Sequence, residues 1–287
     1  MTSIRPTEEE RSRGQLRPET VAAAKQAINE DGFVVLEDVV DLEHIAILRD
    51  KMLADLPSVL ARGDAPFNFT LSNVQQDPPP MEPYLFRDVL LNDFAIQVTE
   101  SVLGKGVQNA FYSGNMALPR TDQRQPTHAD MGHLWPNMEH PTPAYALVVN
   151  LPLVDMDVSN GATELWPGSH WDTSIALQEG DIKVSRERLD EWRVKRPPIQ
   201  PSVKAGSILI RDMRLWHGGT PNPSDQARPM IAMIHWVGWW IHGEAMKFPA
   251  SSKPFFDHPQ LRTHANFVEG PIDYLKHGEA YDVDPNR

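Results

Sequence analysis

The chain has 287 residues, and its 39 acidic side chains against 27 lysines and arginines give a formal net charge of −12. A negative field repels phosphate backbones, and no run of Lys or Arg forms a basic stripe, so we expect no nucleic-acid partner. The absence of cysteine excludes disulfides, thiolate catalysis and iron–sulfur clusters, so a metal site would need histidine and carboxylate ligands.

The ends of the chain differ in character from its middle. Residues 1–17 are rich in Arg, Glu, Ser and Thr without an apolar period, and we expect them to form a mobile arm. They lack the apolar centre of a signal peptide, and no later segment approaches the roughly 18 apolar residues of a membrane span. The sequence therefore predicts a cytoplasmic protein without a membrane partner, with one domain over residues 18–287.

The first half of this domain has the spacing of helices. Apolar residues recur every three to four positions in segments 18–32 and 42–60, and a third helix is expected over 92–103, before a glycine. The apolar, β-branched segment 33–40 lies between the first two helices. Segment 63–83 contains five prolines and few periodic apolar residues, so we expect a long loop there, a candidate lid.

The second half changes to short apolar runs separated by Gly and Pro, with one short helix expected over 185–193. The expected strands are 107–118, 144–151, 162–166, 199–203, 207–212 and 229–237. Helices followed by strands, without alternation, favour a sandwich or barrel over a parallel α/β sheet. The aromatic segment 238–287 has no period, and we expect it to wrap the core, cover a pocket or form a homodimer interface.

Common catalytic signatures are missing. The sequence has no GxGxxG, no phosphate-binding GxxxxGK[ST], no GxSxG and no HExxH motif. The sequence therefore contains no motif that supports a nucleotide-binding fold, a serine hydrolase or one of the commonest zinc proteases.

One pair of segments favours a metal site. In an extended chain side chains alternate faces, so His128 and Asp130 project the same way and can bind one ion. A third ligand, His217, is followed by two glycines that allow close backbone approach. Two imidazoles and one carboxylate suit Fe(II) and leave coordination positions open. The simpler alternative is that an isolated HxD pair arises by chance and that each histidine only packs in the core.

Further downstream, Arg228 begins an apolar strand. A buried arginine is costly unless it meets an anion, and its planar fork suits a carboxylate.

Four motifs in this order resemble the phytanoyl-CoA dioxygenase-like family of Fe(II)/2-oxoglutarate-dependent oxygenases. They are DGFVV at 31–35, THAD at 127–130, NGATELWPGSH at 160–170, and HGGTPN at 217–222 leading to Arg228. The resemblance covers roughly residues 32–237. It implies a mainly β fold with flanking helices, in which a double-stranded β-helix (a cupin-like jelly roll, about 107–237) is buttressed by the N-terminal helices.

The resemblance also implies roles for single residues. His128, Asp130 and His217 match the iron ligands, and Arg228 matches the partner of the distal carboxylate of 2-oxoglutarate. Gln125 and Thr163 occupy positions where relatives contact this cosubstrate, although Gln125 can instead cap a turn and Thr163 can be an ordinary strand residue.

Two residues just beyond the THAD motif, Met131 and His133, are candidates for substrate binding, with packing as the alternative. Six tryptophans near the motifs suggest an apolar pocket, although aromatic residues in strands most often pack the core. They are Trp135, Trp166, Trp216, Trp236, Trp239 and Trp240.

By this resemblance, the expected reaction uses Fe(II), 2-oxoglutarate and O2 to oxidise a C–H bond of a small organic molecule, with release of succinate and CO2. Hydroxylation, desaturation and cyclisation remain open, whereas Asp130 disfavours halogenation, because related halogenases lack this carboxylate. A secondary-metabolite or amino-acid-derived substrate is preferred over a CoA thioester, for which no basic patch is present.

Two alternatives remain. One is a cupin-type metal dioxygenase that does not use 2-oxoglutarate and has no role for Arg228, and the other is a non-catalytic jelly-roll binding protein.

Overall fold

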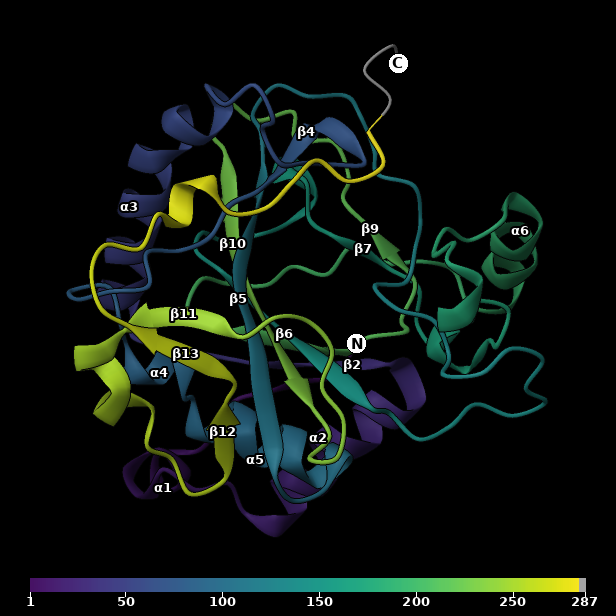
Figure 1. The fold of residues 1–287 in the computed structure, drawn as a ribbon. Helices are drawn as coiled ribbons and strands as arrows, with labels where there is room; N and C mark the ends of the chain where they lie inside the picture. The colour runs from purple at the N-terminus through teal and green to yellow at the C-terminus, as the bar shows by residue number, and fades with distance from the viewer. Residues whose placement is uncertain (284–287) are drawn as a thin grey trace.

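A nine-stranded sheet runs through the centre of the computed structural model, which describes residues 1–283 (Figure 1). Neighbouring strands from β2 to β3 are antiparallel, and β1 and β12 add to the sheet in parallel. The order is β1 (Ser3–Ile4), β2 (Phe33–Leu36), β8 (Ile208–Asp212), β6 (Ala146–Pro152), β10 (Arg228–Trp236), β5 (Val107–Ala117), β4 (Thr70–Gln75) and β3 (Phe67–Asn68), with β12 (Leu261–Thr263) beside β5.

A second, smaller layer faces this sheet. Its strands β7 (Glu164–Leu165) and β9 (His217–Gly218) are antiparallel, and single bridges attach His128 to His217 and Ile199 to Leu165. The two layers confirm the expected mainly β jelly roll. A third pair, β11 (Met246–Pro249) and β13 (Ala265–Val268), is parallel and lies in the C-terminal segment.

Helices cover the outer face of the large sheet. The described helices are α1 (Glu8–Arg13), α2 (Pro18–Asp31), α3 (Leu42–Leu60), α4 (Arg87–Leu90), α5 (Asp93–Leu103) and α6 (Arg186–Lys195). The longer ones begin where the sequence supplies a start: α2 has proline in its first turn, and the side chains of Asp41 and Asn92 accept backbone N–H groups at the starts of α3 and α5. Helix α2 ends at Gly32, whose φ of 87° suits glycine.

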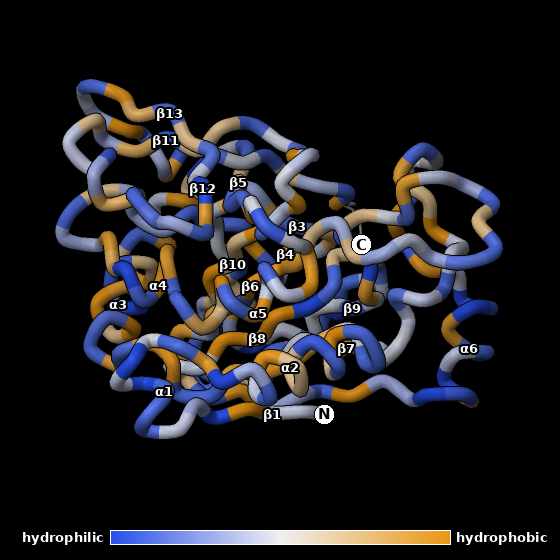
Figure 2. The backbone as a smooth tube through the Cα atoms, turned by 90° about the horizontal axis from the view of Figure 1, so that it is seen from below, coloured by the Kyte–Doolittle hydropathy of each residue, from blue (hydrophilic) through white to orange (hydrophobic). Residues whose placement is uncertain are grey.

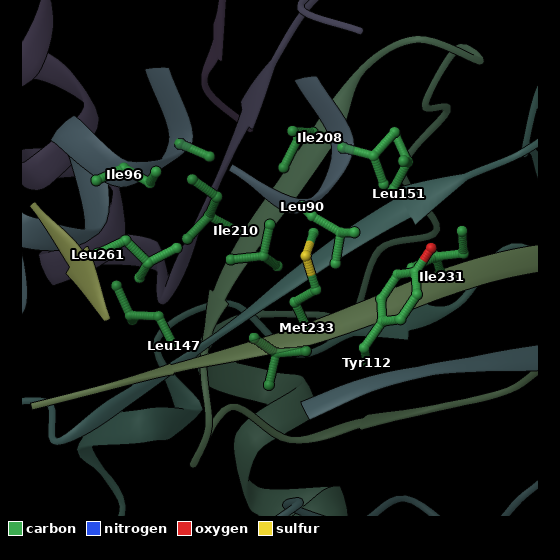
Figure 3. Close-up of a cluster of buried hydrophobic side chains, with 14 of the residues drawn as sticks. Leu90, Ile96, Tyr112, Leu147, Leu151, Ile208, Ile210, Ile231, Met233 and Leu261 are labelled. Carbon is green, nitrogen blue, oxygen red and sulfur yellow. The ribbon is translucent and has the colours of Figure 1, made fainter. Parts of the chain in front are cut away.

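Alternation along the strands divides the core into two parts. Ile208 and Ile210 of β8, with Ile231 and Met233 of β10, point outward and meet helix residues such as Ile96 (Figure 3). The intervening residues point toward the small layer, where a second cluster fills the space between the layers. Its members are Phe33, Val35, Met156, Ala162, Leu165, Val203, Leu209, Leu215 and Met230. Each strand therefore has one face for the helices and one for the interior.

The hydropathy of the chain follows this arrangement. Hydrophobic segments gather around β6, β8 and β10, whereas α6 stands apart at one side and has no buried residue (Figure 2). Within residues 1–283, no helix combines the length and apolar character needed to cross a bilayer.

The expectation of a mobile arm over residues 1–17 is wrong. Ser3 and Ile4 pair with β2, and α1 has a complete capping box between Thr7 and Glu10. Glu10 is buried, and its carboxylate accepts hydrogen bonds from Thr20 and from the backbone of Arg17. The pairing of Ser3 and Ile4 with β2 is made with a distant segment, so the local sequence pattern does not reveal it, whereas Thr7 and Glu10 have the spacing of a capping box.

Three further expectations need correction. Segment 63–83 is not a continuous loop, because it contains β3 and β4, which extend the large sheet past β5. The expected strand at 199–203 is reduced to single bridges, and that at 162–166 to β7. The aperiodic segment 238–287 contains three short strands, β11 to β13; its residues 284–287 lie outside the described part.

A buried histidine leads us to expect that the folded protein loses stability in acid. His235 on β10 shares a hydrogen bond with Thr99 of α5 (Nδ1 to Oγ1, 2.9 Å), and burial lowers its pKa to about 3. At pH values between this pKa and the unfolded-state pKa of roughly 6.5, the histidine is protonated in the unfolded chain but neutral in the folded protein. The free energy of unfolding therefore falls as the pH falls. We expect His235→Gln to reduce this slope of unfolding free energy against pH by up to about 1.4 kcal/mol per pH unit.

The slope is measured by denaturant unfolding between roughly pH 4 and 7. His140→Gln is the matched control, because the His140 side chain is 85% exposed. An unchanged slope in His235→Gln would show that this histidine does not hold a depressed pKa.

Candidate metal centre

Three side chains meet on the interior side of the small layer. His128 and His217 are joined by an antiparallel bridge, with N–H to O distances of 2.9 and 2.8 Å in the two directions. Asp130 Oδ1 lies 3.4 Å from His217 Nε2 and 3.9 Å from His128 Nε2. One ligand atom from each residue lies within 4.8 Å of the others, so the three can hold one metal ion.

Hydrogen bonds to the backbone orient both imidazoles. His128 Nδ1 lies 2.8 Å from the carbonyl oxygen of Pro126, and His217 Nδ1 lies 3.0 Å from that of Leu215. Carbonyl oxygens only accept, so each Nδ1 carries the proton and each Nε2 presents a lone pair toward Asp130. Burial, and then the neighbouring His217, lower the pKa of His128 to about 3, which keeps this ring neutral.

Asp130 is held by an arginine. Arg211 Nη2 donates to Asp130 Oδ2 at 2.5 Å, and Arg211 Nε donates to Asn150 Oδ1 at 3.1 Å. Burial alone would raise the pKa of Asp130, but Arg211 and His217 hold it well below its usual range. The site thus presents two imidazoles and one carboxylate, a donor set that suits Fe(II).

Arg228 occupies the start of β10, on the same face as Met230 and Ala232. It is 1% exposed, and one hydrogen bond is present, from Nη2 to the carbonyl oxygen of Gly161 at 3.2 Å. Within residues 1–283 its Nε and Nη1 have no hydrogen-bond partner, and burial lowers its pKa to about 10. A buried guanidinium with unpaired N–H groups is suited to an anionic ligand.

Gln125 and Thr163 both line the large interior cavity, which has a volume of about 1070 Å³. Gln125 joins two segments, because its Oε1 accepts from Gly219 N at 2.8 Å and its Nε2 donates to Asn68 O at 3.1 Å. The structure thus gives Gln125 the turn-holding contacts named as its alternative role. Thr163 lies just before β7 and is buried.

The two candidates for substrate binding differ in their position relative to the cavity. Met131 lines the cavity, together with His128, Asp130 and His217. His133 is not among the residues that line the cavity, and its Nε2 lies 2.9 Å from the carbonyl oxygen of Asp172. This contact fits the packing role named as its alternative, because the ring supports a loop, and a contact with substrate stays a prediction.

Two features of the site were not expected. Arg211 was not predicted to be a site residue, although its place in the alternating strand 207–212 indicates that it points inward. The C-terminal segment was not expected to supply so much of the cavity wall, which includes residues 242–248 and 271–277. Of the six tryptophans, Trp236 lines the cavity, whereas Trp166 and Trp216 pack together in the core.

The C-terminal segment is tied to the rest of the cavity wall. His277 Nδ1 lies 2.7 Å from Asp77 Oδ2, and Ser113 donates to the other oxygen of Asp77 at 2.5 Å. Arg62 donates to the carbonyl oxygens of Leu275, His277 and Gly278. In Figure 1 the yellow C-terminal chain passes from β13 toward β4, and a bridge joins Tyr281 to Asn68.

Comparison with known proteins supports the same fold. The model of the phytanoyl-CoA dioxygenase (PhyH) family matches residues 28–230. AviO1 from Streptomyces viridochromogenes Tue57 is 20% identical with a TM-score of 0.58, covering 77% of this chain and 97% of that one. EctD from S. alaskensis, crystallised with 2-oxoglutarate and 5-hydroxyectoine, is 18% identical with a TM-score of 0.60, covering 82% and 83%. EvdMO1 is 22% identical with a TM-score of 0.54, covering 75% and 50%.

The arrangement of the three candidate ligands predicts how metal binding depends on them. In anaerobic Fe(II) titrations followed by calorimetry, His128→Ala and Asp130→Ala should each weaken binding by more than about 100-fold, beyond the usual cost of losing an outer hydrogen-bond partner. His140→Ala, which changes an exposed histidine, should bind as the wild type does. Wild-type affinity in the first two variants would place the metal elsewhere.

Proposed function

The chain belongs to the phytanoyl-CoA dioxygenase family, and on this premise we propose that it oxidises a C–H bond of a small organic molecule as an Fe(II)/2-oxoglutarate-dependent oxygenase. One observation carries the proposal: His128, Asp130 and His217 direct free ligand atoms at one point, while buried Arg228 keeps two nitrogen atoms without a partner.

The side chains fit the two groups that such an enzyme needs. The Nε2 atoms and Asp130 Oδ1 would hold Fe(II), and Arg228 would pair with the distal carboxylate of 2-oxoglutarate. An Fe(II) ion and 2-oxoglutarate held there would allow O2 to act as the oxidant, with two electrons supplied by the conversion of 2-oxoglutarate to succinate and CO2 and two by the C–H bond of the substrate. The EctD structure with bound 2-oxoglutarate supports the choice of cosubstrate.

The chain's own residues prepare this chemistry. Backbone hydrogen bonds fix a proton on Nδ1 of each imidazole, so Nε2 is the nitrogen of each ring that faces the metal position. We assign to Gln125 the role of holding Gly219 beside His217, and to Thr163 a place on the wall near the cosubstrate.

The cavity suggests the class of substrate. Its volume of about 1070 Å³ accommodates a small organic molecule. Met131, Met213, Ile234 and Trp236 supply apolar wall, whereas Asp77 and Ser113 supply polar wall. A molecule with both characters, such as a secondary metabolite or an amino-acid-derived intermediate, fits this lining. Hydroxylation is the simplest outcome, with desaturation or cyclisation set by where the substrate is held.

We assign to residues 238–283 the role of a cover over the cavity. Its contacts through His277 and Arg62 support this role. Phe248 and Phe256 pack against each other in the same chain (ring centroids 4.4 Å apart), which favours the cover over the homodimer interface, although Trp239 stays exposed.

Each of the two alternative functions leaves one feature of the site unexplained. A metal dioxygenase without 2-oxoglutarate gives Arg228 no partner for its buried charge, and a non-catalytic binding protein gives no reason for the converging ligand atoms.

The proposal predicts succinate release from 2-oxoglutarate in the presence of Fe(II) and O2. Arg228→Ala should raise the concentration of 2-oxoglutarate needed for half-maximal release by about 10- to 100-fold, because hydrogen bonds to charged groups contribute about 1.5–3 kcal/mol. Its Fe(II) affinity should remain that of the wild type.

Arg120→Ala is the matched control, because Arg120 is exposed and pairs with Asp225. An unchanged dependence on 2-oxoglutarate in Arg228→Ala would contradict the proposal and favour the dioxygenase that does not use this cosubstrate.

A further inference from the structure

The contact between Arg211 and Asp130 has a consequence for the coordination of the metal. We propose that Arg211 is a positioning residue that restricts Asp130 to one ligand oxygen, and thereby keeps a coordination position free for the cosubstrate or O2. This inference rests on the proposed function and concerns the chain's own residues around the metal.

The two oxygens of Asp130 have different surroundings. Oδ1 faces the imidazoles, at 3.4 Å from His217 Nε2 and 3.9 Å from His128 Nε2. Oδ2 accepts the hydrogen bond from Arg211 Nη2 at 2.5 Å. Charge-assisted hydrogen bonds of this kind are strong, so turning Oδ2 toward the metal would require breaking one.

Arg211 itself is held in place. It lies on β8 between Phe33 of β2 and Val148 of β6, and it is 6% exposed. Its Nε donates to Asn150 Oδ1 at 3.1 Å, from the neighbouring strand β6. The guanidinium is planar and cannot lose its proton in this setting. Arg211 is therefore a fixed donor, and Asn150 fixes its direction.

The contact between Arg211 and Asp130 matters because an octahedral ion has a limited number of coordination positions. Two imidazoles and one carboxylate oxygen leave about three positions of an octahedral ion open. A 2-oxo acid that chelates through its carboxylate and oxo oxygens takes two, and O2 needs the third. If Asp130 supplied both oxygens, only two positions would remain. The 2-oxo acid could then chelate in one arrangement only, with no position left for O2, and any other arrangement would have to displace Asp130 Oδ2.

This role and a purely structural one predict opposite effects on metal affinity when Arg211 is removed. Arg211 places a positive charge beside a bound cation, which opposes metal binding. Its removal should therefore leave metal affinity unchanged or raise it, while 2-oxo acid affinity falls. If Arg211 only maintained the fold, its removal would weaken both.

Pyruvate separates Arg211 from Arg228. It has the carboxylate and oxo group of 2-oxoglutarate but no distal carboxylate, so its binding does not depend on Arg228. Arg211→Met removes the donor, Arg211→Lys keeps one, and Arg228→Met serves as the matched variant at the second buried arginine.

The experiment measures anaerobic binding of Fe(II), and then of pyruvate and 2-oxoglutarate to the Fe(II)-loaded proteins, by calorimetry. In Arg211→Met, Fe(II) should bind at least as tightly as in the wild type, and both 2-oxo acids should bind about 10-fold more weakly, a change of about 1.4 kcal/mol in binding free energy. Arg211→Lys should recover part of this loss. Arg228→Met should weaken 2-oxoglutarate alone.

Other outcomes overturn the inference. Wild-type pyruvate affinity in Arg211→Met would show that Asp130 does not need this restraint, and a loss of Fe(II) binding as large as in Asp130→Ala would indicate a structural role. If Arg211→Met does not fold, Asn150→Ala takes its place, because it removes only the hydrogen bond that supports Arg211. Asn150→Ala should weaken the binding of both 2-oxo acids to a smaller extent. Unchanged affinity for them in this variant would contradict the inference. If Asp130→Ala binds Fe(II) as the wild type does, the proposed function itself fails.

Discussion

The bridge between His128 and His217 is the constraint on which the site depends. Two backbone hydrogen bonds place these residues side by side in the small layer, although they are far apart in the sequence. Because side chains at a bridge point to the same face, both Nε2 atoms reach the interior together. Asp130 then reaches the same point from two residues beyond His128, since residues i and i+2 share a face.

The large sheet supplies the buried charges that complete the site. Arg211 and Arg228 lie on strands β8 and β10, whose outward residues pack against the helices (Figure 3). Arg211 lines the cavity, whereas Arg228 is buried at the start of β10 and is not among the residues that line it. Burying two guanidinium groups is costly. Arg211 is paired with Asp130 and Asn150 through Nη2 and Nε, although its Nη1 has no partner within residues 1–283. Arg228 keeps two nitrogen atoms without a partner in the same part of the chain, which suits the binding of an anion.

Much of this could be predicted from the sequence, because helices, buried strands and the ligand motifs have local patterns. The period of α3 and the apolar run of β10 are read directly, and His128, Asp130, His217 and Arg228 carry recognisable types and spacing. Features made by distant contacts could not be read in this way. Ser3 and Ile4 pair with β2, and His133 lies within hydrogen-bond distance of the carbonyl oxygen of Asp172, 39 residues further along the chain.

The central claim is that one metal and 2-oxoglutarate bind between the triad and Arg228. An anaerobic crystal structure with Mn(II) and 2-oxoglutarate tests it most directly, because the anomalous signal of manganese locates the ion. The account predicts one ion on His128 Nε2, His217 Nε2 and Asp130 Oδ1, with the distal carboxylate of 2-oxoglutarate paired with Arg228. An ion bound elsewhere, or a 2-oxoglutarate that leaves Arg228 unpaired, would contradict it.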